Sequence, residues 1–166
     1  WARVHEDAFL DRLEDRYIMF GEWCYALHSE FYDRLPHYFL EFDVFDREQG
    51  VFLSTQDRND LLDGLPVVSV PVLATGLFDR LSDITQLLGP SLYKSPDWRK
   101  AFADAAGNAG VDPGTAKQWV DDSDLAEGLY IKVEWDGQVM DRLKYVRADF
   151  VQAIQDTQTH WADRPM

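Results

Sequence analysis

The stretch Glu127-Gly128-Leu129-Tyr130-Ile131-Lys132 carries the clearest structural signal in the chain, together with Lys144-Tyr145-Val146-Arg147 further on. A glutamate and a glycine stand where a turn is expected, and an apolar run then ends on a lysine. A second run carries two more cations, and Asp136-Gly137 between the runs is a strong signal for a tight hairpin turn. We therefore predict two antiparallel strands, over residues 129–135 and 139–146.

The charged residues of this predicted hairpin suggest a chemical role. Because alternate side chains of a strand share one face, Glu127 and the cations can line one pocket. A carboxylate suits a divalent cation, and lysines suit phosphate oxygens. Glu127, Lys132 and Lys144 are therefore candidate catalytic residues, with Lys144 suited to stabilise charge on a transferred phosphate. The ordinary alternative is a charged strand edge that discourages aggregation.

The rest of the chain mixes helical and strand patterns. Helices are predicted over residues 6–15, from Ser54 or Thr55 to Leu62, over 76–88, twice within 97–119, and from Asp149 with Phe150, Ile154 and Trp161 as apolar positions. Strands are predicted over 17–20, ended by Gly21, and over 38–45 and 51–53, while Pro71 makes 67–73 an edge strand or an extended link. With no repeat and no linker, the fold class is α+β, one unit of mainly antiparallel sheets with flanking helices.

The composition is that of a globular domain with a core. Apolar residues make up 46% of the 166 residues, and no apolar run approaches the ~18 residues of a membrane span. Cys24 is the only cysteine, which favours a reducing cytoplasm.

The charge balance is strongly acidic. The net charge is −14, from 16 Lys and Arg against 30 Asp and Glu, so the basic footprint of nucleic-acid binders is absent overall. Three explanations stay open: no nucleic acid is bound, binding uses a small cationic site, or the basic part lies elsewhere in a longer protein.

Two further candidates lie in the predicted N-terminal strands. Glu22 follows the strand 17–20, where a carboxylate can accept hydrogen bonds from ribose hydroxyls, although an exposed turn glutamate is the ordinary explanation. Phe42 can stack on a purine base, although core packing is the ordinary explanation. Asp43 beside it is unusual, because a carboxylate in an apolar strand needs partners.

Four segments, taken in their order along the chain, resemble motifs of the ATP-dependent RNA ligase family of covalent nucleotidyltransferases. The resemblance covers residues 17–150. Tyr17 to Trp23 resembles that family's motif III, and Tyr38 to Val44 resembles motif IIIa. Glu127 to Lys132 resembles motif IV, and Leu143 to Arg147 resembles motif V. The resemblance implies a partial nucleotidyltransferase domain with an ATP-grasp-like ligase fold, ATP and Mg²⁺ as cofactors, AMP as a covalent intermediate, and RNA ends as partners.

The resemblance also implies roles for single residues. Glu22 would contact the ribose, Phe42 would stack on adenine, Glu127 would serve the metal or the nucleophile, and Lys144 would contact the α-phosphate. Lys132 is carried over as a third catalytic residue, and Arg147 as a cofactor-binding residue. Motif V commonly has two lysines two positions apart, but Val146 takes the second position here, and Arg147 points to the opposite strand face unless a bulge intervenes.

The family's motif I, K-x-D-G, holds the lysine that attacks the α-phosphate. None of the five lysines, Lys94, Lys100, Lys117, Lys132 and Lys144, is followed by that pattern. Because motif I precedes motif III and residue 1 is Trp, we expect a longer parent protein in which 1–166 is a single partial domain, truncated at both ends. The fragment alone should be inactive, and a sheet edge should be exposed where upstream strands are missing.

The leading interpretation is a fragment of an ATP-dependent RNA ligase, which forms an enzyme–AMP intermediate and seals 5′-phosphate to 3′-hydroxyl ends. Within the same class, a DNA ligase or a capping-type nucleotidyltransferase is the alternative. From another class, the alternative is a non-catalytic nucleotide-binding or interaction domain. The sequence predicts no membrane partner and leaves the oligomeric state open.

Overall fold

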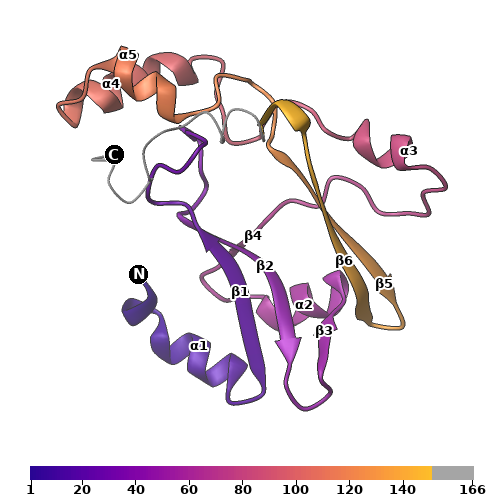
Figure 1. Ribbon diagram of the computed structural model, residues 1–166. Coiled ribbons are helices and arrows are strands. Elements are labelled where there is room, and N and C mark those ends of the chain that lie inside the picture. The colour runs from indigo at the N-terminus through magenta and orange to yellow at the C-terminus, as the bar shows by residue number, and fades with distance from the viewer. Residues whose placement is uncertain (151–166) are drawn as a thin grey trace. The chain divides into compact units, whose positions relative to one another are not determined.

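The computed structural model describes residues 1–150 (Figure 1). The helices are η1 Ala2–Val4, α1 Glu6–Leu13, α2 Thr55–Leu62, α3 Leu81–Thr85, α4 Trp98–Asn108, α5 Pro113–Ala116 and η2 Lys117–Trp119. The strands are β1 Tyr17–Trp23, β2 Phe39–Asp46, β3 Val51–Leu53, β4 Val68–Ser69, β5 Gly128–Trp135 and β6 Gln138–Val146. The predicted final helix, with apolar positions at Ile154 and Trp161, lies outside the described residues apart from its first few positions.

The strands form a mainly antiparallel sheet, which confirms the predicted α+β class. Five strands follow the order β1-β2-β3-β6-β5, and β4 adds to β2 in parallel. Among the described residues, β1 and β5 are therefore the outermost strands of this path. The expectation that strands from outside this sequence cover such an edge stays a prediction.

Contacts divide the chain into two compact units. Unit 1 contains Trp1–Cys24, His37–Pro71 and Tyr130–Leu143. Unit 2 contains Tyr25–Pro36, Val72–Leu129 and, of the described residues, 144–150. The expectation of a single partial domain over 1–166 stays a prediction.

In unit 1, the pairing of β1 with β2 contains a β-bulge. Phe20 lies opposite Asp43 but Gly21 lies opposite Glu41, so Phe42 is an extra residue on β2. Gly21 does not end the strand as predicted, because β2 supplies hydrogen-bonding partners up to Trp23. Position 21 requires a glycine for a steric reason. A Cβ there would stand 2.7 Å from the Leu40 carbonyl oxygen and would collide with the Phe39 ring.

The strand β2 buries three carboxylates, those of Glu41, Asp43 and Asp46, and each has a cationic partner. Glu41 is fully buried, forms an ion pair with Arg58 of α2 at 3.0 Å, and accepts a hydrogen bond from Ser69 at 2.7 Å. Burial nevertheless raises the pKa of Glu41, because loss of water around the carboxylate outweighs these partners. Ser54 caps α2 by accepting from the Asp57 amide, as one of the two predicted caps.

The hairpin of β5 and β6 has the predicted turn. Asp136 and Gly137 both have positive φ, at 49° and 76°, as the tightest two-residue hairpin turns require. This hairpin also joins the rest of the sheet, because β6 pairs with β3 through Val139 and Phe52.

The core of unit 2 is formed by α4 and its surroundings. Trp98, Phe102 and Ala106 lie on one buried face of α4 and pack with Leu27 and Ala116. The helix predicted over 76–88 is wrong in length, since only α3 is helical there. Leu77 and Leu81 are exposed, so their helical spacing has no apolar surface to pack against.

Among the described residues, none of the helices combines the length and the apolar character that a membrane span needs.

Candidate functional site

The six residues predicted from the sequence are divided between the two units. Glu22, Phe42 and Lys132 belong to unit 1, and Glu127, Lys144 and Arg147 belong to unit 2. A single pocket that would join all six residues stays a prediction.

In unit 2, Glu127 and Lys144 form an ion pair with a separation of 3.0 Å between Oε1 and Nζ. Both side chains reach solvent, with 37% of Glu127 and 62% of Lys144 exposed. An exposed pair of this kind adds little to stability. It can therefore separate without great loss and offer a carboxylate and an ammonium to a ligand.

The backbone around Glu127 is tightly constrained. Gly128 starts β5 so close to β6 that a Cβ on it would stand 3.0 Å from the Val146 Cα and would collide with the Tyr145 carbonyl oxygen. The Arg147 amide also donates a hydrogen bond of 3.1 Å to the Glu127 carbonyl oxygen. The exposed pair is thus mounted on rigid backbone.

In unit 1, Phe42 sits at the bulge of β2 and is half-buried. Its ring contacts the Tyr130 ring edge-on, with 5.6 Å between centroids. Bulges commonly redirect a side chain beside a functional site. The Phe42 carbonyl oxygen accepts a hydrogen bond from the Lys132 ammonium.

Lys132 forms an ion pair with Asp43, to which the sequence analysis gave no functional role. Its Nζ lies 2.7 Å from Asp43, and only 12% of the side chain is exposed. Asp43 also accepts a hydrogen bond from the Tyr130 hydroxyl at 2.6 Å and pairs with Arg142 at 3.2 Å. Burial, followed by the hydrogen bond to Asp43, raises the pKa of Tyr130 to about 12.

The cluster of Asp43, Tyr130, Lys132 and Arg142 is therefore what sequence reasoning missed. An aspartate inside an apolar strand was the one available signal, since a buried carboxylate requires partners. Its partners lie on β5 and β6, far away in the sequence, and Arg142 also covers the Phe52 ring at 3.6 Å.

Glu22 lies on β1 directly after Gly21 and opposite Leu40. It is exposed, as a carboxylate that accepts hydrogen bonds from a ligand must be. It belongs to the strand rather than to a turn, which differs from the predicted position.

Arg147 differs most from the other candidates, because its guanidinium is buried. Only 4% of the side chain is exposed, and it pairs with Asp121, with Asp149 at 2.8 Å, and with Glu30 at 3.8 Å. β6 ends at Val146, so the face alternation of the strand does not apply to Arg147. A direct contact with a cofactor stays a prediction.

Glu127 is the candidate residue with which this chain could bind a magnesium ion. Magnesium binds through one or two carboxylates together with substrate phosphates and water. Glu127 offers one accessible carboxylate, while the described part of the chain holds no group of three or more His, Cys, Asp or Glu side chains arranged for a metal. The residues thus fit a metal that arrives with a phosphate ligand rather than one held by protein alone.

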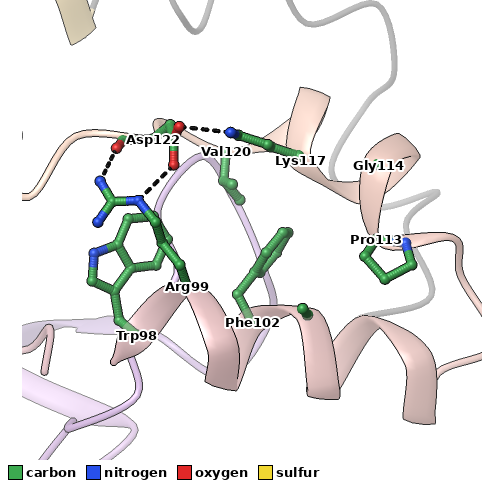
Figure 2. A pocket seen from close by; sticks show the side chains of 9 residues that line it. Trp98, Arg99, Phe102, Pro113, Gly114, Lys117, Val120 and Asp122 are labelled. Carbon is green, nitrogen blue, oxygen red and sulfur yellow. Dashed lines mark hydrogen bonds and ion pairs between the residues drawn. The ribbon is translucent and has the colours of Figure 1, made fainter. Parts of the chain in front are cut away.

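An apolar hollow of about 260 Å³ lies elsewhere in unit 2, over α4 and α5 (Figure 2). Phe102, Pro113 and Val120 line it, while Asp122 joins Arg99 and Lys117 by ion pairs at 2.9 and 2.8 Å on its rim. None of the six predicted residues lines this hollow.

Comparison with known proteins gives one family. The family described as RNA ligase matches residues 1–146 of the chain. Neither the curated proteins nor the solved structures give a match.

Proposed function

The chain belongs to the RNA ligase family, and on that premise we propose that it forms the nucleotide-binding part of an ATP-dependent RNA ligase. The observation that carries the proposal is the accessible Glu127–Lys144 ion pair, mounted on constrained backbone at one end of a hairpin. A carboxylate and an ammonium held side by side can receive a metal-bound phosphate group, with one charge for each component.

The proposed reaction has three steps. A lysine attacks the α-phosphate of ATP and pyrophosphate leaves, so AMP becomes bound to the enzyme. AMP then passes to the 5′-phosphate of an RNA end, and the 3′-hydroxyl of another end displaces it. The attacking lysine carries the K-x-D-G motif, which follows none of the five lysines of this sequence.

The residues of this chain would bind and orient the nucleotide. Glu22 accepts hydrogen bonds from the ribose hydroxyls, and Phe42 stacks on the adenine from its position at the bulge. Lys144 leaves Glu127 to stabilise the negative charge that grows on the α-phosphate. Lys132, which is paired with Asp43, supports the backbone of Phe42 by its hydrogen bond to the carbonyl oxygen and also contributes its positive charge.

Magnesium, held by Glu127 and the phosphates when bound, would neutralise phosphate charge. Glu127 would pair with the Lys144 ammonium when the site is empty and with the metal ion when the nucleotide is bound, so the proposed site needs only one carboxylate. The single cysteine remains the reason to expect a reducing cytoplasm as the site of action.

The experiment that tests the nucleotide site is Phe42→Ala in the full-length ligase. Loss of one stacking aromatic should weaken ATP binding by roughly 1–3 kcal/mol, by analogy with base stacking in single-strand binding. Phe45→Ala is the matched control, because it removes a ring from the same strand, where Phe45 packs against Phe52. Equal ATP affinity in the Phe42→Ala and wild-type proteins, measured by calorimetry, would remove the adenine site.

RNA is the proposed substrate because the chain belongs to the RNA ligase family. An assay of end sealing and nucleotide transfer decides between this substrate and the alternatives. Nicked RNA and nicked DNA should be offered to the adenylated protein, and GTP with an RNA that ends in a 5′-diphosphate should be offered to the unmodified protein. Sealing of DNA with no sealing of RNA would favour a DNA ligase, and transfer of GMP would favour a capping enzyme. Absence of any nucleotide transfer by the full-length protein would favour a non-catalytic binding domain.

A further inference from the structure

Four buried charged residues lie next to the Glu127–Lys144 pair within unit 2. Two are carboxylates and two are cations, and together they form the charged cluster: Glu30, Asp121, Lys94 and Arg147. Glu30 pairs with Lys94 at 2.5 Å, and both side chains are almost completely buried, at 6% and 2% exposure. Their formal charges cancel.

Stability alone does not account for these buried charges. Removing two charges from water is expensive, and apolar residues of the same size often stabilise a protein as well or better. In some proteins, buried polar or ionic groups fix one arrangement of the structure among several. The charged cluster is therefore expected to fix one local arrangement of the backbone.

The hydrogen bonds of Arg147 identify this arrangement. Its Nε donates to the Ala126 carbonyl oxygen at 3.0 Å, while its own amide donates to the Glu127 carbonyl oxygen at 3.1 Å. One residue after β6 thus holds two successive residues before β5. Asp121 and Glu30 hold the guanidinium from the other side, and the Asp121 amide bonds to the Ser29 carbonyl oxygen at 2.9 Å.

We propose that Arg147 is a positioning residue, which fixes the backbone at Ala126 and Glu127 against the end of β6 and so sets the Glu127 carboxylate relative to Lys144. This role rests on the proposed function, because the pair matters only if it serves the nucleotide. Arg147 acts through its neighbours and touches no substrate, which explains how a residue in the motif V segment can be buried. A displacement of about 1 Å at a reacting group can reduce a rate roughly 100-fold.

A double-mutant cycle in the full-length ligase tests the proposal. Arg147→Lys keeps the positive charge but removes the fork that reaches Ala126 while holding Asp121. We expect it to slow protein–AMP formation roughly 10–100-fold. In the Glu127→Ala background, the same substitution should have less than a threefold effect, because the carboxylate that it displaces is already gone. Equal fold-losses in both backgrounds would overturn the proposal, since Arg147 would then act independently of Glu127.

Arg58→Lys is the matched control. Arg58 is a buried arginine, 2% exposed and paired with Glu41 at 3.0 Å, but it belongs to unit 1, whereas the charged cluster belongs to unit 2. Whatever a shortened buried arginine costs in folding, its effect should be the same with and without the Glu127 carboxylate. Coupling to Glu127 as strong as that of Arg147→Lys would mean a general loss of structure and would overturn the specific role.

A second measurement separates this proposal from the ligase assignment. Amide hydrogen exchange of Gly128 and Arg147 reports opening of the backbone, whatever the protein catalyses. We expect Arg147→Lys to speed exchange at 126–128 and at 147 at least tenfold, while exchange in β1 and β2 stays as in the wild type. Unchanged exchange at 126–128 would overturn the clamp even if the protein proves to be a ligase. If the wild type forms no protein–AMP, the ligase proposal fails, and faster exchange still supports the clamp.

Discussion

Single side chains carry the proposed chemistry, and Lys144 offers the sharpest comparison among them. In the full-length ligase, Glu127→Ala and Lys144→Ala should each slow protein–AMP formation by about 10²–10³, because one charge contact to a transition state contributes about 2.7–4 kcal/mol. Lys117→Ala is the control, since Lys117 is 60% exposed and pairs with Asp122 at 2.8 Å, much as Lys144 pairs with Glu127. A loss of similar size in Lys117→Ala would show that removal of any exposed lysine is harmful.

Glu30 gives a prediction about pH at the same scale. Burial raises the pKa of its carboxyl to about 7, more than the neighbouring Lys94 and Arg147 lower it, and Asp121 also contributes to the rise. Because the folded pKa exceeds the ordinary value of 4.5, the folded protein binds the proton more tightly than the unfolded chain does. The contribution of Glu30 to stability is therefore complete below pH ~4.5 and decreases as the pH rises through 7.

The variant Glu30→Gln removes this titration. Between pH 5 and 8, the wild type should lose about 2–3 kcal/mol of unfolding free energy through Glu30, at about 1.4 kcal/mol for each unit of pKa shift. The Glu30→Gln protein should show a correspondingly flatter dependence in urea titrations at several pH values. Parallel curves for both proteins would mean that Glu30 is not the group that takes up the proton.

At the scale of elements, signals that lie close together in the sequence predicted the structure well. The hairpin of β5 and β6 was predicted because Asp136-Gly137 fits only a few turns, and α2 because Ser54 can cap it. The length of β1 was wrong because its second half depends on a distant partner, β2, rather than on Gly21 alone. The helix over 76–88 was wrong because periodicity predicts an apolar face but not a surface to cover it.

The candidate site shows the same difference between features that local sequence signals predict and features that depend on distant contacts. Glu127, Lys132, Lys144, Phe42 and Glu22 were chosen from local patterns and from their order in the chain. The partners of Asp43, and the burial of Arg147 among carboxylates, depend on contacts across many residues, so no local pattern revealed them. The bulge at Phe42 was likewise hidden, because it arises from the register between two strands.

The start of β5 also allows a direct test of backbone packing. Gly128→Ala should destabilise the protein by more than 1 kcal/mol, because the added Cβ collides with the Tyr145 carbonyl oxygen and the backbone must move apart. Gly107→Ala is the control, since Gly107 lies in α4 with open space around it. Alanine there should stabilise the helix by roughly 0.5–1 kcal/mol. Thermal unfolding of both variants decides the point, and an unchanged melting temperature for Gly128→Ala would contradict the close approach of the strands.

For the molecule as a whole, the acidic charge limits how RNA can bind. A net charge of −14 gives no general attraction for a polyanion, so a ligand must reach a local group of cations. Most of the arginines and lysines discussed here already have carboxylate partners, which reduces the cationic surface further. The proposed function therefore relies on a few contacts to one nucleotide more than on a long basic groove.

The 166-residue chain by itself should not become adenylated. Four of its five lysines lie in ion pairs, with Glu30, Asp122, Asp43 and Glu127 as the partners of Lys94, Lys117, Lys132 and Lys144. An ammonium held by a carboxylate has no lone pair for attack on phosphorus, and none of the five lysines carries the K-x-D-G pattern. Incubation with α-labelled ATP and Mg²⁺ should thus leave no acid-precipitable label on the chain, while the full-length protein in the same buffer should gain one. Label on the chain, mapped to any of the five lysines by mass spectrometry, would show that the nucleophile lies within these residues. If the labelled lysine were Lys132 or Lys144, that residue would be the nucleophile, and the role proposed for it here would be wrong.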